Sequence, residues 1–188
     1  MTLDDGAPDA VLASRAAEGD ERAFAVLVGR HKEPLYRLLR RYTGDADEAY
    51  EAAHEAFIAA WVALGRYDPQ RPFLAWLRTI AINKARDRGR RMAFRRLLFG
   101  GGLGTSAALG ATDPAIAPDA AVMERQDQAM LDHAIASLPA NLKEALLLTT
   151  FDGWSQREAG EILGVSAKSI ETRVYRARKL LARTLEKR

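Results

Sequence analysis

The sequence reads SQREAGEILGVS from Ser155 to Ser166, and this segment predicts two short helices that meet at a tight turn. Ser155 can accept a hydrogen bond from a free amide of the new helix while Glu158 reaches back to the cap, which is the pattern of a capping box. Gly164 can adopt the left-handed conformation that ends this helix, and Ser166 can cap the next one. The segment is therefore typical of a helix-turn-helix.

The helix expected after Ser166 has an apolar side and a polar side. Its apolar residues recur at spacings of three and four, which places them on one buried stripe: Ile170, Val174, Ala177 and Leu181. The other faces carry the side chains that a DNA major groove would meet: Lys168, Ser169, Glu171, Thr172, Arg173, Tyr175, Arg176 and Lys179. From Ser166 to Arg188, eight Lys and Arg oppose two Glu, a net charge of +6. A solvated surface can carry such a run too, but the capped helix pair before it favours DNA binding.

Charge is segregated along the rest of the chain as well. Residues 43–65 contain no Lys or Arg and five acids, whereas residues 78–96 contain eight Lys and Arg against one Asp, a net charge of +7. Two basic segments suggest two contacts with one polyanion, and the acidic segment suggests a basic protein partner.

Composition excludes several classes of protein. The 188 residues include no cysteine, so disulfides, thiolate metal sites and cysteine nucleophiles are ruled out. His31, His54 and His133 lie far apart in sequence, so we expect no metal and no cofactor. The first twenty residues do not resemble a secretory signal, and no apolar run approaches the ~20 residues that span a bilayer. We expect a cytoplasmic protein without membrane insertion.

The pattern along the chain predicts an all-α fold of two small helical domains joined by a flexible linker. Apolar residues recur at helical spacing in 24–39, 49–61 and from about Phe73, with Trp76 expected in the core. Gly- and Pro-rich residues after Phe99 lack periodicity. We expect a flexible acidic tail at 1–19, a helical domain at 20–96, a linker at 97–127 and the helix-turn-helix domain at 128–188. Whether residues 94–99 extend the third helix or begin the linker stays open.

Two segments resemble the extracytoplasmic-function sigma factors of bacterial RNA polymerase, group IV of the sigma-70 family. Arg66-Tyr67-Asp68, the run from Phe73 to Asn83 and the pair Asp87-Arg88 are similar to region two of that family. Leu138-Pro139, the quoted segment 155–166 and the run 170–178 are similar to region four. The two segments cover roughly residues 20–92 and 128–186 in the family's order.

The resemblance implies a sigma factor that binds core RNA polymerase, directs promoter recognition and opening, and is controlled by an anti-sigma factor. It places contacts with the coiled coil of the polymerase beta-prime subunit at Glu48, Glu51 and Glu55. It places contacts with the melted −10 element at Arg66, Tyr67, Asp68, Arg71, Phe73, Asn83, Arg86 and Arg90. Arg78 is expected to serve the same strand, and the helix from Lys168 to Arg176 is expected to read the −35 element.

Asn83 has two interpretations, because its amide can bind a splayed base or can bond within its own neighbourhood. The chain also departs from the family pattern at two places. Tyr50 and His54 stand in the segment that docks on core polymerase, where the family has an acidic residue and a Gln. Glu171 stands where a basic residue is common, and a carboxylate there favours the amino group of cytosine.

Two other classes of function are alternatives to a sigma factor. A stand-alone helix-turn-helix regulator would use the N-terminal helices for dimerisation or sensing. An enzyme would need a phosphate-binding glycine loop, a nucleophile elbow or a histidine and carboxylate at catalytic spacing, and the sequence has none of these. We therefore expect no catalytic residues and no small-molecule substrate.

Overall fold

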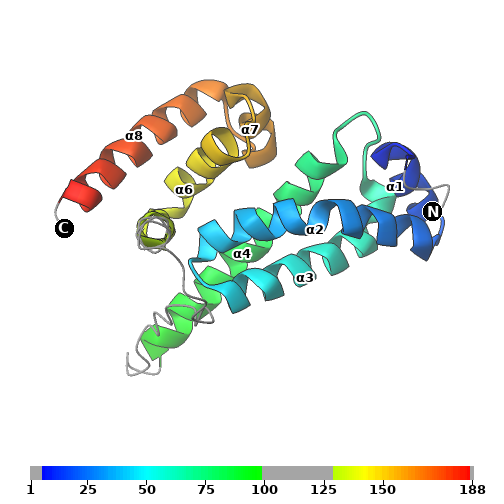
Figure 1. Cartoon of the computed structure of the whole chain (residues 1–188), viewed down its shortest axis with the longest axis horizontal. Helices are drawn as coiled ribbons and strands as arrows, with labels where there is room; N and C mark the ends of the chain where they lie inside the picture. The colour runs from blue at the N-terminus through cyan, green and yellow to red at the C-terminus, as the bar shows by residue number, and fades with distance from the viewer. Residues whose placement is uncertain (1–5, 99–128, 187–188) are drawn as a thin grey trace, which may run out of the picture.

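The computed structural model describes residues 6–98 and 129–186, and within these ranges it contains helices and no strands (Figure 1). The N-terminal domain consists of α1 (Asp9–Ala17), α2 (Glu21–Thr43), α3 (Ala46–Ala63), the 3-10 turn η1 (Leu64–Arg66) and α4 (Phe73–Leu98). The C-terminal domain consists of a helical segment at 129–136, α6 (Ala140–Leu146), the π-helical turn η2 (Leu147–Phe151), α7 (Gln156–Leu163) and α8 (Ala167–Glu186). The all-α prediction is confirmed, and residues 94–98 extend the third predicted helix.

Local signals define the ends of α2 and α3. The carboxylate of Asp20 accepts hydrogen bonds from the amides of Arg22 and Ala23 and so caps α2, which ends at Gly44 in the left-handed conformation at φ 78°. Asp45 then caps α3 by accepting from the amide of Glu48. A cap of this kind stabilises a helix by about 1 kcal/mol. The two helices therefore extend a few residues beyond the apolar ranges 24–39 and 49–61 that predicted them.

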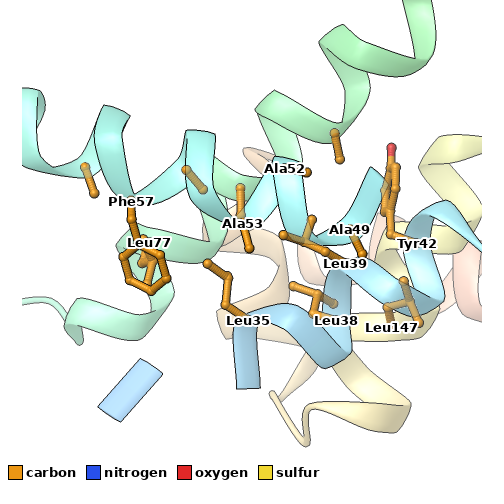
Figure 2. Close-up of a cluster of buried hydrophobic side chains, with 14 of the residues drawn as sticks. Leu35, Leu38, Leu39, Tyr42, Ala49, Ala52, Ala53, Phe57, Leu77 and Leu147 are labelled. Carbon is orange, nitrogen blue, oxygen red and sulfur yellow. The ribbon is translucent and has the colours of Figure 1, made fainter. Parts of the chain in front are cut away.

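The core of the N-terminal domain lies where α2 and α3 pack on each other and on α4 (Figure 2). Leucines of α2 face small residues of α3, so the helices approach closely. Leu35 and Leu39 of α2, and Ala49, Ala52 and Ala56 of α3, are all fully buried. Interiors are packed as densely as organic crystals, so this fit positions α4 closely on the other two helices.

The N-terminus differs from the expected flexible tail. Residues 9–17 form α1, and Leu12, Ala13 and Ala16 are buried in the same core as α2 and α3. The acids and small residues of this segment suggest a tail, but its three apolar residues at positions i, i+1 and i+4 form one face of a helix. Within the described residues after Gly6, the predicted tail is wrong.

The helix-turn-helix has the capping predicted for it. Ser155 Oγ accepts from the amide of Glu158, and the Glu158 carboxylate accepts from the amide of Ser155 at 2.9 Å. The same contacts hold the pKa of Glu158 below its usual value, first through the Ser155 side chain. Gly164 ends α7 at φ 67°, and the hydroxyl of Ser166 accepts from the amide of Ser169 at the start of α8.

The two domains share their apolar core. One buried cluster joins Leu38 and Leu39 of α2 to Ile135 and to Leu147, and a second joins Ile82 of α4 to residues of α6, α7 and α8. Residues 99–127 of the linker predicted at 97–127 lie outside the described residues, and positions 97 and 98 belong to α4. No helix in the described ranges has both the length and the apolar character needed to cross a membrane.

Candidate nucleic-acid interface

The exposed face of α8 carries the residues predicted to read duplex DNA. Ile170 and Ala177 are fully buried, whereas Lys168, Thr172, Tyr175 and Arg176 are exposed, so the helix has the orientation that the sequence predicts. The Tyr175 ring is 66% exposed. A helix held in this way presents a row of donors and acceptors that fits a major groove. The remaining predicted positions, Ser169 and Arg173, are half-buried, and Glu171 and Lys179 are exposed.

The N-terminal end of α8 borders a shallow, open depression. The depression is lined by Asn141 and Leu142 of α6 and by Ser166, Lys168, Ser169, Thr172, Arg173 and Arg176. Lys168 Nζ lies 2.9 Å from a carboxylate oxygen of Glu171, one turn further along the helix. Asn141 is the member that the sequence analysis missed. In the sequence, Asn141 is recognisable only as an amide residue shortly after Leu138-Pro139. Tertiary packing alone brings this turn beside α8.

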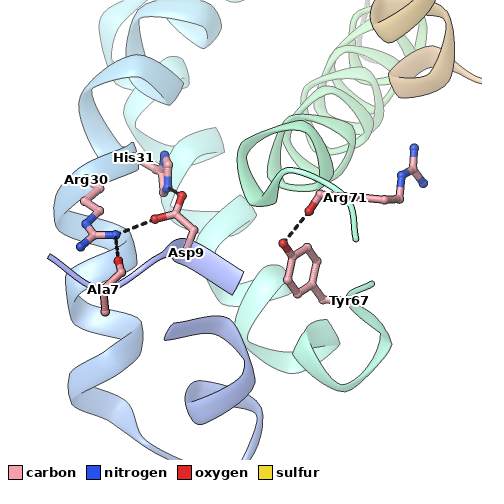
Figure 3. A network of polar contacts seen from close by, with 6 residues as sticks. All are labelled: Ala7, Asp9, Arg30, His31, Tyr67 and Arg71. Carbon is pink, nitrogen blue, oxygen red and sulfur yellow. Dashed lines mark hydrogen bonds and ion pairs between the residues drawn. The ribbon is translucent and has the colours of Figure 1, made fainter. Parts of the chain in front are cut away.

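The loop before α4 has a rigid aromatic base. The rings of Tyr67, Phe73 and Trp76 contact one another pairwise, with centroids between 5.2 and 5.6 Å apart. The Tyr67 hydroxyl donates a hydrogen bond of 2.6 Å to the carbonyl of Arg71, and the Arg71 side chain points away from this contact (Figure 3). Trp76, predicted in the core, is half-buried and packs against it.

Three of the residues predicted to contact the −10 strand are exposed on this loop, namely Arg66, Asp68 and Arg71. Phe73 was predicted to contact the strand, but its side chain is only 2% exposed. It packs inside the aromatic cluster because it occupies the first turn of α4 facing the core. The prediction is therefore corrected: Phe73 supports the loop from inside the aromatic cluster and does not present its ring to solvent.

Polar residues on the basic face of α4 differ in their partners and in their exposure. Asn83 is exposed, and its side-chain oxygen accepts a hydrogen bond of 3.3 Å from Arg86. Arg90 is exposed and pairs with Asp87 of its own helix. Arg88 pairs instead with Glu51 and Glu55 of α3, at 2.6 and 2.7 Å.

Arg78 does not face solvent. It is 4% exposed, its Nε lies 2.8 Å from Asp152 Oδ2, and its guanidinium lies over the ring of Trp154. Arg78 Nε and Asp152 Oδ2 are close to each other but do not have hydrogen-bonding geometry. Burial lowers the pKa of Arg78 and raises that of Asp152, because both charges have left water. The expectation that Arg78 serves a DNA strand is not met in this arrangement of the domains.

Arg86 also contacts the C-terminal domain. Its Nε donates at 2.6 Å to Glu144 and its Nη2 to the second carboxylate oxygen of the same residue. The Glu144 side chain is completely buried and also accepts from the Tyr42 hydroxyl at 3.1 Å. Burial first, and the Glu144 charge second, raise the pKa of Tyr42.

Lys143 completes the contact between the domains. Its Nζ donates to the carbonyl of Tyr42 at 2.8 Å and to the carbonyl of Ala136 at 2.6 Å, so it joins the end of α2 to the end of the 129–136 helix. Burial lowers its pKa to about 8. We call the contacts of Arg78, Arg86, Lys143, Glu144 and Asp152 the interdomain seam.

The acidic face of α3 lies on the N-terminal domain away from α8. Glu51 has a side chain that is 63% exposed, and that of Glu55 is 36% exposed. Glu48 is half-buried. Tyr50, His54 and Ile58 recur every four residues beside these acids and are exposed, so the face combines acidic and apolar side chains.

Comparisons with known proteins agree with the division of the chain into two domains. The family model of Sigma-70 region 2 matches residues 27–95, and that of Sigma-70 region 4 matches residues 128–181. The chain is 36% identical to the RNA polymerase sigma factor CnrH of Cupriavidus metallidurans, over 95% of this chain and 94% of that protein. It is 32% identical to the ECF RNA polymerase sigma factor SigW of Bacillus subtilis, over 89% and 91% of the two chains.

A solved structure has the same fold over nearly the whole length. The structure of CnrH in complex with the cytosolic domain of CnrY superposes with a TM-score of 0.68, at 33% identity, and covers 95% of this chain and 97% of that one. Both domains and their order therefore match in sequence and in structure. The chain belongs to the extracytoplasmic-function sigma factors of the sigma-70 family, which are transcription initiation factors.

Proposed function

We propose that this sigma factor reads duplex DNA at the −35 element with α8 and holds the unpaired −10 strand with the loop at 66–72. One observation carries the proposal: the same chain exposes the polar face of a helix-turn-helix and, on a separate domain, an arginine-bearing loop over an aromatic cluster. A helix can read base edges in a groove, whereas a single strand is tracked by cations and held by a shaped surface. Asn83 and Arg90 extend the strand-binding surface along α4, and Asn141 extends the surface around α8.

The acidic face of α3 is the proposed site for core RNA polymerase. Glu51 and Glu55 offer negative charge, and Tyr50 and Ile58 offer apolar area that no described residue covers. A basic helical partner would satisfy both. The chain would then act as a non-catalytic subunit of the cytoplasmic polymerase.

The interdomain seam limits when the strand-binding surface is complete. Arg86 cannot bind Glu144 and a phosphate with the same nitrogens, so the seam has to open at Arg86 before this residue can contact DNA. Arg78 is subject to the same condition. Of the predicted strand contacts, Arg66, Asp68, Arg71, Asn83 and Arg90 do not depend on opening.

We further propose that a protein of the anti-sigma type binds this chain. The relative CnrH was solved with the cytosolic domain of CnrY, and the present chain matches CnrH over nearly its whole length. Copurification from the host tests this point. A partner that displaces core polymerase from the chain supports it, and recovery of the chain with core polymerase alone contradicts it.

The decisive experiment compares promoter binding by the chain alone and with core polymerase. We expect sequence-specific retardation of promoter DNA only with core polymerase, because each DNA contact surface is small. Glu51→Lys should weaken core association at least tenfold in a titration. The matched control is Glu33→Lys, an exposed acid on the face of α2 that points away from α3. Tight promoter binding by the chain alone, or equal effects of the two variants, would contradict the assignment.

A further inference from the structure

Helix α1 lies outside the segment that matches the region 2 family, yet it packs beside the loop proposed to hold the −10 strand. The family match begins at residue 27, whereas α1 spans Asp9 to Ala17. It contacts both η1 and α4, the elements on either side of the loop. The pKa of Tyr67 is raised by burial first and then by the charge of Asp9, so the first residue of α1 lies close to the loop.

Asp9 is held from two sides by α2. One carboxylate oxygen accepts from Arg30 Nη1 at 2.8 Å, and the other lies 2.6 Å from His31 Nε2 (Figure 3). Arg30 also donates to the carbonyl of Ala7 at 2.7 Å. A carboxylate paired with a guanidinium is ionised and only accepts hydrogen bonds, so the Nε2 atom of His31 carries a proton. Asp9 thereby sets both the tautomer and the orientation of the imidazole.

His31 passes this orientation to the loop. Its side chain is almost fully buried, and its ring centroid lies 5.4 Å from that of Phe73. Phe73 packs edge-on against Tyr67, whose hydroxyl bonds to the carbonyl of Arg71. An unbroken series of contacts therefore runs from Asp9 through two buried rings to the loop.

We infer that Asp9 is a positioning residue for promoter opening, which sets the loop at 66–72 in the shape that binds an unpaired DNA strand. The inference rests on the proposed strand-binding role of that loop. A loop that is already ordered loses less conformational entropy when it binds, so its affinity is higher. Without the Asp9 carboxylate, the imidazole is free to turn, and Phe73 and Tyr67 lose a fixed surface.

The test uses holoenzyme and a fork-junction DNA selected by wild-type holoenzyme from a pool with randomised unpaired nucleotides. Asp9→Asn should lower affinity for the selected strand about fivefold. Affinity for a duplex carrying only the −35 element should stay unchanged. Asp9→Glu keeps the charge and the acceptor oxygens and should restore most of the loss.

The matched control is Asp20→Asn. Asp20 also joins α1 to α2, through Arg15 at 2.6 Å, and it caps α2 by accepting from the amides of Arg22 and Ala23, which are not part of the aromatic cluster. This variant should lower the melting temperature while it leaves strand affinity within twofold. If both variants weaken strand and duplex binding in proportion to their loss of stability, α1 is only a structural support and the inference is wrong.

A spectroscopic measurement on the free chain does not depend on DNA. Fluorine NMR of 5-fluorotryptophan protein should show a shifted or broadened Trp76 resonance in Asp9→Asn and an unchanged one in Asp20→Asn. An unchanged Trp76 resonance in both would overturn the inference.

Arg71→Ala separates the inference from the proposed function. If Arg71→Ala weakens strand binding and Asp9→Asn does not, the loop binds the strand but Asp9 does not position it. If Arg71→Ala has no effect either, the proposed role of the loop fails and the inference fails with it.

Discussion

At the scale of single residues, Glu171 is the side chain on α8 whose chemistry is most specific. A carboxylate can accept from the N4 amino group of cytosine but repels phosphate, and the 2.9 Å contact with Lys168 holds it near the groove-facing surface. The pair itself is exposed and stabilises the protein little.

We therefore expect Glu171→Gln to relax base preference at one position of the −35 element by about 1–3 kcal/mol, with little change in total affinity. Selection of binding sites by wild-type and variant holoenzyme measures this preference. Arg178→Gln, on the flank of the same helix, is the control and should weaken binding to all sequences alike. Identical base preferences in wild type and Glu171→Gln would show that Glu171 does not contact a base.

The buried amine of Lys143 makes stability depend on pH. Burial lowers its pKa from 10.5 to about 8, so between these values the unfolded chain binds more protons than the folded chain. The free energy of unfolding should then rise by about 1–2 kcal/mol from pH 7.5 to 9.5. Above pH 10 Tyr42 opposes this trend, because its raised pKa makes the folded state retain a proton that the unfolded state loses.

Urea titrations across this pH range test the prediction. Lys143→Met should remove the rise, and Lys168→Met, which changes an exposed lysine, should keep it. A rise that persists in Lys143→Met would assign the effect to another group.

At the scale of elements, the turn between α7 and α8 depends on Gly160. A Cβ at this position would lie 2.6 Å from the carbonyl oxygen of Val165, a backbone atom that cannot move aside alone. Gly164 has the left-handed φ and was recognised from sequence, whereas Gly160 has an ordinary helical conformation and gave no local signal.

We expect Gly160→Ala to destabilise the protein by about 1–3 kcal/mol through this overlap. Gly89→Ala is the matched control, because Gly89 lies inside α4 with nothing near its missing Cβ. It should stabilise the protein by about 0.5–1 kcal/mol through helix propensity. Thermal unfolding of both variants decides the matter, and a neutral Gly160→Ala would mean that the turn can widen without cost.

At the scale of the whole molecule, the interdomain seam joins two domains that the sequence predicts as separate units. Its polar centre is a buried carboxylate, Glu144, between Arg86 and Tyr42. Buried ion pairs gain little net stability, but removal of one partner leaves the other charge buried alone. The seam can therefore open when both charges are hydrated together, and it is disrupted when one is removed.

Glu144→Gln should cost about 1–3 kcal/mol and separate the domains, because it weakens the contacts with half-buried Arg86 and with Tyr42. The control is Asp87→Asn, which removes the partner of exposed Arg90 and should leave stability close to that of the wild type. Small-angle X-ray scattering should show a larger radius of gyration for Glu144→Gln only. An unchanged radius would mean that the apolar contacts alone keep the domains together.

Local sequence signals predicted α2, α3, α4, the capped helix-turn-helix and the orientation of α8, because these depend on residues within one or two turns of each other. Only the packing of the two domains shows which of the charged residues are exposed. Arg78, Arg86 and Arg90 belong to the same basic run, but packing of the second domain buries Arg78 against Asp152, pairs half-buried Arg86 with Glu144 and leaves Arg90 exposed. Packing also decides the roles of α1, Phe73 and Asn141. Their roles depend on partners distant in sequence, and the spacing of residues along one helix carries no information about which partner will cover it.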